Sequence, residues 1–172
     1  MGAAEDDCPE IWVQPGESHV VRGAAVLRTV LGSCVGVTFW NRRLGIGAMC
    51  HAMLPQSPGK HALSPAAARR YVDLTICDVA VQLDALGAWR SETEVKVFGG
   101  ADVLVVEEST RRATVGRLNC EAALRILESE GFAVRASSLG GKCGMHIDFY
   151  TATGEVLLRR LKATGAEKQR GE

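Results

Sequence analysis

Two short segments of the chain carry residue types suited to covalent chemistry. In the first, Gly32 and Ser33 precede Cys34, and in the second, His51 follows Cys50 within an apolar run. A Gly-Ser turn between two strands would leave backbone N–H groups free beside Cys34, and an oxyanion hole requires such free donors. A free thiol has a pKa of about 8.5, so it needs a base such as imidazole to react near neutral pH. If the two segments pair as a hairpin, Cys34 and His51 would meet as nucleophile and base for attack on an acyl carbon.

Each of these residues also has a simpler interpretation when it is taken alone. A free cysteine in an apolar strand is most often buried packing, and a single histidine is most often a structural residue. The cysteines lie at wide intervals, at positions 8, 34, 50, 77, 120 and 143, which favours separate thiols in a reducing compartment over a disulfide framework. Cys143 and His146 have the spacing of a zinc-ligand pair, but no second pair matches them, so we expect no metal site.

The pattern of apolar residues predicts the strands that must position this pair. Strand-like runs separated by turn residues lie at 19–22, 25–31, 34–40, 45–54, 95–98, 103–106, 132–137, 146–150 and 156–161. A turn at 41–43 joins the runs that carry Cys34 and His51, so antiparallel pairing is the expected connection. His51 then shares a strand face with Met49 and Met53, while Cys50 lies on the other face.

Two helices are predicted among these strands. The first begins at Pro65 and carries an apolar stripe that runs to Leu86, and the second spans 116–129. The candidates for burial on the second helix are Leu118, Leu124 and Leu127. Strands that bracket two helices without regular alternation predict an α+β fold, a single domain of mixed or antiparallel, sandwich-like β-sheets flanked by two or three helices.

The composition bounds the class of protein. The 172 residues suit one domain, and 20 Lys and Arg balance 20 Asp and Glu, so the broad basic face that nucleic acid requires is not expected. No stretch approaches the roughly 18 apolar residues that cross a bilayer, and the N-terminus is acidic where a secretory signal would be basic. We therefore expect a cytoplasmic protein without membrane insertion. An acidic tail is expected over 1–13 and a second tail over 162–172.

Five ordered segments resemble one known family. They read LGSCVGV at 31–37, GIGAMCHAMLP at 45–55, VKVFGGADV at 95–103, TVGRLNCEAAL at 114–124 and GGKCGMHIDFYTATGEVLLRRL at 140–161. In this order they resemble the bacterial chemotaxis family CheD, the chemoreceptor glutamine deamidases. The resemblance implies a deamidase domain over 14–161. It would hydrolyse side-chain amides of particular glutamines on methyl-accepting chemoreceptors to glutamate, with some activity on glutamyl methyl esters.

The resemblance also implies roles for individual residues. The family's catalytic cysteine corresponds to Cys34 and its histidine to His51, 17 positions later. The third catalytic residue is usually a threonine six positions before the cysteine, where this chain has Arg28, and the threonine here is Thr29. We take Thr29 as the third residue, although a shift of one turns a side chain to the opposite face of a strand unless a bulge corrects it.

Further implications concern the oxyanion hole, cofactors and partners. Backbone N–H groups around Gly32 and Ser33 are expected to hold the oxyanion, and acyl transfer to a cysteine requires no cofactor or metal. The expected partners are the chemoreceptors, as protein substrate, and a CheC-like phosphatase, as regulator. Met145 stands where the family tends to have an arginine.

Three hypotheses of function remain open at the level of sequence. The first is a cysteine hydrolase that modifies receptors. The second is a catalytically impaired module that docks on receptors or on a CheC-like phosphatase, which the departures at Arg28 and Met145 suggest. The third is a redox or disulfide-bearing protein, which rests only on the number of cysteines.

Overall fold

The strands of the protein form two mixed sheets. The structure is a computed structural model that describes residues 8–59, 63–103 and 113–162. One sheet has the order β1-β3-β8-β9 and the other β2-β5-β4-β6-β7. The strands are β1 (Glu10–Trp12), β2 (Glu17–Arg22), β3 (Val26–Leu31), β4 (Val35–Asn41), β5 (Ile46–Ala52), β6 (Thr93–Gly99), β7 (Val134–Leu139), β8 (Met145–Tyr150) and β9 (Glu155–Arg160). The β1–β3 and β6–β7 pairs are parallel and the other neighbours are antiparallel.

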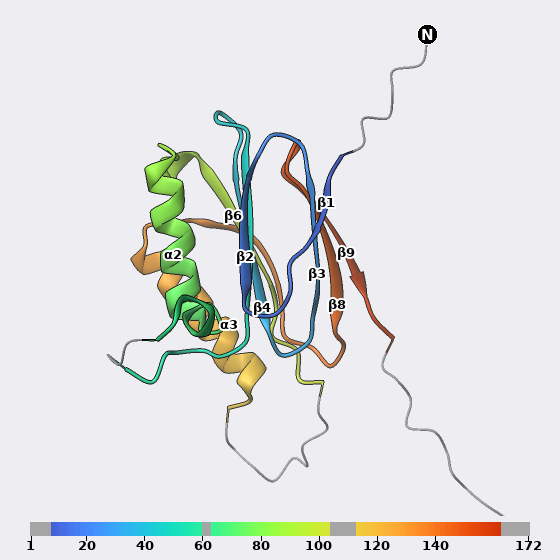
Figure 1. Cartoon of the computed structure of the whole chain (residues 1–172). Coiled ribbons are helices and arrows are strands. Elements are labelled where there is room, and N and C mark those ends of the chain that lie inside the picture. Colours follow the sequence, from blue (N-terminus) through green and yellow to red (C-terminus); the bar gives the residue numbers. More distant parts are fainter. Residues whose placement is uncertain (1–7, 60–62, 104–112, 163–172) are drawn as a thin grey trace, which may run out of the picture.

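These sheets and two helices make three layers (Figure 1). Helices α2 (Val72–Ala85) and α3 (Val115–Ser129) cover one face of the five-stranded sheet, and the four-stranded sheet packs on its other face. One apolar cluster fills the space between helices and sheet, and a second, which includes Leu31, Met49 and Phe149, fills the space between the two sheets. The predicted α+β class with mixed, sandwich-like sheets flanked by helices is confirmed.

Strands β4 and β5 form the predicted hairpin. Their pairing runs from Asn41 opposite Ile46 to Val35 opposite Ala52. Cys34 directly precedes β4 and His51 is the penultimate residue of β5, so both lie at the end of the ladder away from its turn. Successive residues of these strands point to opposite faces of the sheet, so alternate side chains belong to the two different apolar clusters.

The helix predicted from Pro65 onward is interrupted. The structure has a short helix α1 (Pro65–Ala68), and α2 starts only after a gap of three residues. The N–H groups of Met53 and Leu54 donate to the carbonyl of Arg70 at 2.9 and 3.0 Å. Because Met53 and Leu54 bond to this carbonyl, it does not take part in a continuous helical hydrogen-bond pattern, and the helix is interrupted here. The same two bonds anchor the end of the strand that carries His51.

The buried face of α3 differs from the predicted one. Leu127 is buried as expected, but Leu118 and Leu124 are 38% and 40% exposed, so their predicted burial is wrong. A Cβ at Gly116 would lie 2.5 Å from the carbonyl oxygen of Gly100, so the helix lies directly on the loop after β6. Only small side chains fit such a close approach, which turns the two leucines outward.

The N-terminal boundary also differs from the predicted one. Residues 10–12, which were predicted to belong to the acidic tail, form β1 and pair with β3. Val13, the next residue in the chain, is buried. A three-residue edge strand is too short to give a pattern of its own. The apolar run at 103–106, except for its first residue, and the tail at 163–172 lie outside the described residues.

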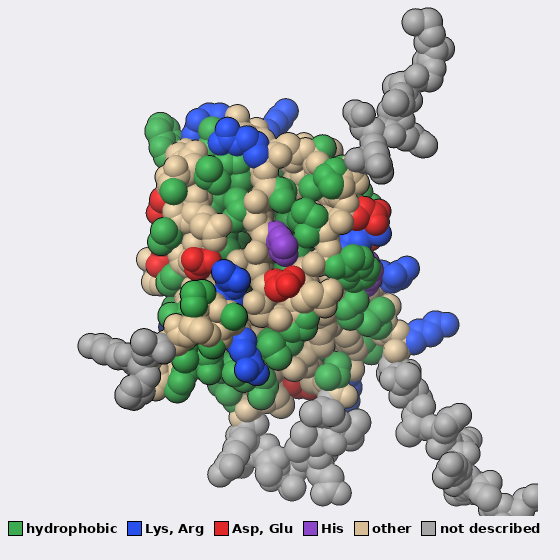
Figure 2. All heavy atoms as spheres, viewed as in Figure 1, with side chains coloured by type: hydrophobic (Ala, Val, Ile, Leu, Met, Phe, Trp, Pro, Cys, Tyr) green, Lys and Arg blue, Asp and Glu red, His purple; other side chains and the backbone are tan. Residues whose placement is uncertain are grey.

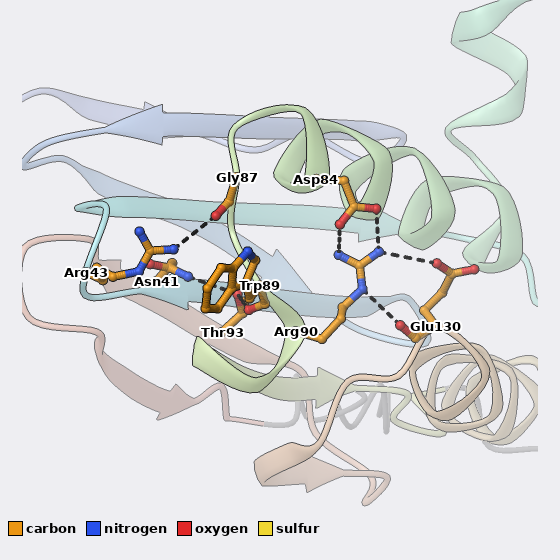
Figure 3. A network of polar contacts seen from close by, with 8 residues as sticks. All are labelled: Asn41, Arg43, Asp84, Gly87, Trp89, Arg90, Thr93 and Glu130. Atoms are coloured by element: carbon orange, nitrogen blue, oxygen red, sulfur yellow. Dashed lines mark hydrogen bonds and ion pairs between the residues drawn. The ribbon is translucent and has the colours of Figure 1, made fainter.

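A polar network fixes the end of the fold near the β4–β5 turn (Figure 3). Arg90 donates from Nη2 to Asp84 Oδ2 at 2.8 Å and from Nε to the carbonyl of Glu130 at 2.9 Å. Asn41 donates to Thr93 Oγ1 at 3.3 Å. The Arg90 contacts join the ends of α2 and α3, and the Asn41 contact joins the hairpin to β6, at the opposite end of the ladder from Cys34 and His51.

The surface has no dominant charge on the face shown in Figure 2, where basic, acidic and apolar side chains are interspersed. This agrees with the equal numbers of basic and acidic residues in the chain. Among the residues that the structure describes, no helix is long and apolar enough to cross a membrane.

Candidate active site

Thr29 and His51 contact each other across the space between the two sheets. Thr29 Oγ1 lies 2.8 Å from His51 Nδ1 and 2.8 Å from the carbonyl oxygen of Val13. A carbonyl only accepts hydrogen bonds, so the hydroxyl donates to Val13 and accepts from the N–H at Nδ1. This contact selects the imidazole tautomer in which Nε2 carries the lone pair, as a general base requires.

The geometry of β3 explains how Thr29 reaches the histidine without a bulge. The pairing of β3 with β8 is continuous over the whole strand, and Thr29 is 1% exposed on the same face as the buried Leu27 and Leu31. Arg28 therefore points the other way, where Nη1 lies 2.9 Å from a Glu10 oxygen and Nε lies 3.1 Å from an Asp148 oxygen. The bulge considered from the sequence is unnecessary, because Thr29 already lies on the inward face of β3.

Cys34 lies in the predicted turn and on the same side of the five-stranded sheet as His51. His51 pairs with Gly36, two residues after Cys34, and the Cys34 side chain packs against the cluster between the sheets. Diagonal neighbours on one face of an antiparallel pair have Cα atoms about 7–8 Å apart, within reach of a long or aromatic side chain. The structure thus brings Thr29, His51 and Cys34 to the same inter-sheet space.

Each carbonyl of the turn before β4 accepts a hydrogen bond from the loop after β6 or from α3. Ala101 N–H donates to Gly32 O at 2.9 Å and Gly100 N–H to Cys34 O at 2.8 Å, while Asn119 Nδ2 donates to Ser33 O at 2.9 Å. In a trans peptide the carbonyl and the following N–H point in opposite directions. The N–H groups of Ser33 and Cys34 are thereby turned away from these partners, and neither donates to the backbone of another described residue.

Burial shifts both titrating groups toward their neutral forms. It raises the pKa of the Cys34 thiol, although the N–H of Cys34 itself opposes this shift. Burial lowers the pKa of His51, and the Val13 carbonyl opposes that shift. The resting pair is therefore a thiol and a neutral imidazole, so the base must take the thiol proton as the nucleophile attacks.

An open cavity reaches this site from the side of β1. It has a volume of about 420 Å³ and is lined by Trp12, Val13, Gln14, Pro15, Thr29, Val30 and His51. Trp12 and Val30 are 47% and 45% exposed, so the mouth is partly apolar. Cys34 is not among the lining residues but is itself partly exposed in the turn.

Several neighbours of Cys34 were missed by the sequence analysis. Asn119 is fully buried and donates to Met53 O at 3.0 Å as well as to the turn. A Cβ at Gly99 would lie 2.3 Å from Cys34 O, so the doublet of Gly99 and Gly100 lets β6 approach the turn. A signal for Asn119 exists in the sequence, because it falls at helical spacing on the stripe of α3 formed by Gly116, Asn119, Cys120, Ala123 and Leu127, all of which are buried.

The remaining residues singled out from the sequence have structural partners. Met145, at the position of the family's arginine, is fully buried between the sheets. His146, part of the zinc-like spacing, lies 2.8 Å from an Asp148 oxygen. Within residues 8–59, 63–103 and 113–162, no group of three or more His, Cys, Asp or Glu side chains is arranged to hold a metal ion.

Comparisons with known proteins agree with the resemblance found in the sequence. The family described as CheD, chemotactic sensory transduction, matches residues 53–160. A probable chemoreceptor glutamine deamidase CheD 2 of Geobacter sulfurreducens is 38% identical over 97% of this chain and 99% of its own length. A probable chemoreceptor glutamine deamidase CheD of Trichlorobacter lovleyi is 39% identical over 86% of this chain and 88% of its own. With a match over more than half of its length and relatives of this similarity, the chain belongs to the CheD family.

Proposed function

We propose that this protein hydrolyses the side-chain amides of particular glutamines on chemoreceptors, with Cys34 as nucleophile and His51 as general base and acid. The observation that carries the proposal is the 2.8 Å contact of Thr29 with His51 Nδ1. It leaves Nε2, buried and without a hydrogen-bond partner among the described residues, as the basic nitrogen. The names of the relatives supply the substrate class, since they are called chemoreceptor glutamine deamidases.

The first half of the reaction forms a thioester. As the Cys34 sulfur attacks the carboxamide carbon, His51 Nε2 takes the thiol proton, because neither group is charged in the resting site. The N–H groups of Ser33 and Cys34 hold the oxyanion of the tetrahedral intermediate. Protonated His51 then gives its proton to the departing nitrogen, so ammonia leaves. The side-chain carbonyl remains bonded to the Cys34 sulfur as a glutamyl thioester.

The second half of the reaction returns the enzyme to its starting state. His51 takes a proton from water, the resulting hydroxide attacks the thioester carbonyl, and the same N–H groups hold the second oxyanion. The carbon–sulfur bond breaks, the thiol regains its proton, and glutamate is released. A glutamyl methyl ester would follow the same course with methanol as the leaving group.

Partners are part of the proposal. The substrate is a protein, and the exposed Trp12 and Val30 at the mouth of the cavity beside His51 offer apolar surface that a protein segment can cover. A CheC-like phosphatase is proposed as a regulator that binds the same region, and such binding should slow deamidation of the receptor. The cytoplasm is the proposed site of action, where the reducing environment keeps Cys34 a free thiol.

The test is mass spectrometry of a cytoplasmic fragment of a chemoreceptor after incubation with the protein. The wild type is expected to convert specific glutamines to glutamate, and Cys34→Ala is expected to convert none while its thermal melt stays nearly unchanged. Cys77→Ala is the matched control, because Cys77 lies on α2 and contacts Glu130; it should keep full activity. Conversion by Cys34→Ala at the wild-type rate would refute the cysteine mechanism. Binding without conversion by the wild type would favour the docking module.

A further inference from the structure

The fully buried side chain of Asn119 has no role in the chemistry described so far. We propose that Asn119 is a positioning residue, which holds the turn before Cys34 so that the Cys34 N–H is aimed at the oxyanion, and which fixes the end of the β4–β5 ladder. The inference rests on the proposed acyl-transfer function. Asn119 comes from α3, and both of its hydrogen bonds between described residues go to backbone carbonyls, so it would act through the backbone.

The position of Asn119 relative to the ladder supports a clamp. The last pair of β4 and β5 is Val35 opposite Ala52, so Cys34 lies directly beyond the end of the ladder and His51 lies one residue inside it. Asn119 Nδ2 bonds to Ser33 O at 2.9 Å and Met53 O at 3.0 Å, one carbonyl from each chain just beyond this end. One amide group therefore replaces the missing cross-strand bonds next to both reacting side chains.

The direction of the Ser33 peptide links Asn119 to the oxyanion. Asn119 holds the Ser33 carbonyl on the side of α3, and the N–H of the same peptide unit belongs to Cys34. Because the peptide is planar and trans, fixing this carbonyl fixes the direction of the Cys34 N–H. That N–H also approaches the Cys34 thiol, whose pKa it lowers against the effect of burial. The oxyanion develops next to the attacking sulfur, so an N–H donor at this place can stabilise it.

The two carbonyl partners explain why the residue is an asparagine. A side-chain amide of this length presents two N–H donors to the two carbonyls. An aspartate of the same shape has only acceptor oxygens, which cannot bond to carbonyl oxygens. Asn119 Oδ1, by contrast, is buried without a hydrogen-bond partner among the described residues. Leaving Oδ1 unpaired costs stability, so the amide is explained by its two donors and not by its oxygen.

The experiment compares two reactions of Cys34 in the isolated protein. Acylation by p-nitrophenyl acetate passes through an oxyanion, whereas alkylation by iodoacetamide is a displacement without one. The rate at Cys34 alone is followed by peptide mass spectrometry, since the other cysteines also react. The variants are Asn119→Ala and Asn119→Asp, and the matched control is Asn41→Ala. Asn41 is also fully buried but lies at the other end of the same ladder.

We expect acylation of Cys34 to fall about tenfold to a hundredfold in both Asn119 variants, with alkylation within about threefold of the wild type. In receptor deamidation, kcat should fall by a similar factor while KM changes little. Asn41→Ala should melt at a lower temperature but keep the wild-type ratio of the two rates. The inference is overturned if both Asn119 variants acylate within twofold of the wild type, or if acylation and alkylation fall together. Cys34 acylation that depends on Asn119 without any receptor deamidation would refute the proposed function and leave this inference standing.

Discussion

Replacing Thr29 by valine tests the contact on which the proposed mechanism depends. Valine has nearly the volume of threonine but no hydroxyl, so Thr29→Val leaves the Nδ1 proton of His51 and the Val13 carbonyl without their shared partner. Thr29 is 1% and His51 2% exposed, so the two groups that lose the hydroxyl are both buried. The imidazole can then turn, or move its proton to Nε2, and either change removes the base from Cys34.

The size of the effect follows from the burial of the pair. Leaving a buried polar group unpaired costs about 1–3 kcal/mol. If that energy is lost from the orientation of the base in the transition state, kcat falls about fivefold to 150-fold. The Val13 carbonyl also approaches the ring and can accept from Nδ1 directly, which sets the lower end of the range. Because Thr29 does not contact the substrate in this mechanism, KM should stay within about threefold.

The assay is the initial rate of glutamine conversion in a receptor fragment, with thermal melting as the measure of folding. Thr29→Ser is the matched control, since it keeps the hydroxyl and loses only a methyl group, and it should retain most of the activity. A fully folded Thr29→Val protein with wild-type kcat would refute the reasoning. So would a Thr29→Ser protein as slow as Thr29→Val, because the methyl group and not the hydroxyl would then matter.

Two further substitutions probe the environment of the site. Burial lowers the pKa of His51 from its usual 6.5, so the unfolded chain binds the proton more readily than the folded one, and stability should fall as the pH drops from about 6.5 toward the folded-state pKa. Urea unfolding at about pH 7.5 and about pH 5 should show a smaller loss for His51→Gln than for the wild type; an equal loss would assign the pH dependence to other groups. Gly99→Ala should cost about 2–5 kcal/mol in urea unfolding, since its φ is +104° and the new Cβ would lie 2.3 Å from Cys34 O. Gly23→Ala, at φ +89° with no atom within 4 Å, should cost only about 1 kcal/mol, and equal losses would contradict the close approach.

The local parts of the site could be predicted from the sequence. The Gly32-Ser33 turn, the hairpin of β4 and β5 and the shared face of Met49 and His51 depend on neighbours in the chain and on the period of a strand. These features are confirmed. The inward direction of Thr29 could have been found in the same way. Thr29 and Arg28 point to opposite faces of the strand, and Thr29 lies on the same face as the buried Leu27 and Leu31.

The parts that depend on packing between distant segments could not be predicted in the same way. The hydrophobicity of Leu118 and Leu124 predicts burial, but the close contact of Gly116 with Gly100 decides which face of α3 turns inward. The interruption between α1 and α2 likewise arises from hydrogen bonds of Leu54 to a segment 16 residues away. The partners of Asn119 could not be predicted for the same reason, since Ser33 and Met53 lie far from α3 in the chain.

What distinguishes Cys34 from the other cysteines is its surroundings and not an acidic thiol. Burial raises the pKa of the Cys34 thiol. It likewise raises the pKa of Cys50 to about 12 and that of Cys77 to about 11. Cys50 is buried on the helix side of the sheet, away from His51, and Cys77 faces the carboxylate of Glu130 and not an imidazole. Cys34 has His51 on the same face and N–H groups aimed by Asn119 and its neighbours. Reactivity toward simple alkylating reagents should therefore follow the exposure of each thiol, whereas acyl transfer, which needs both the base and the oxyanion donors, should select Cys34.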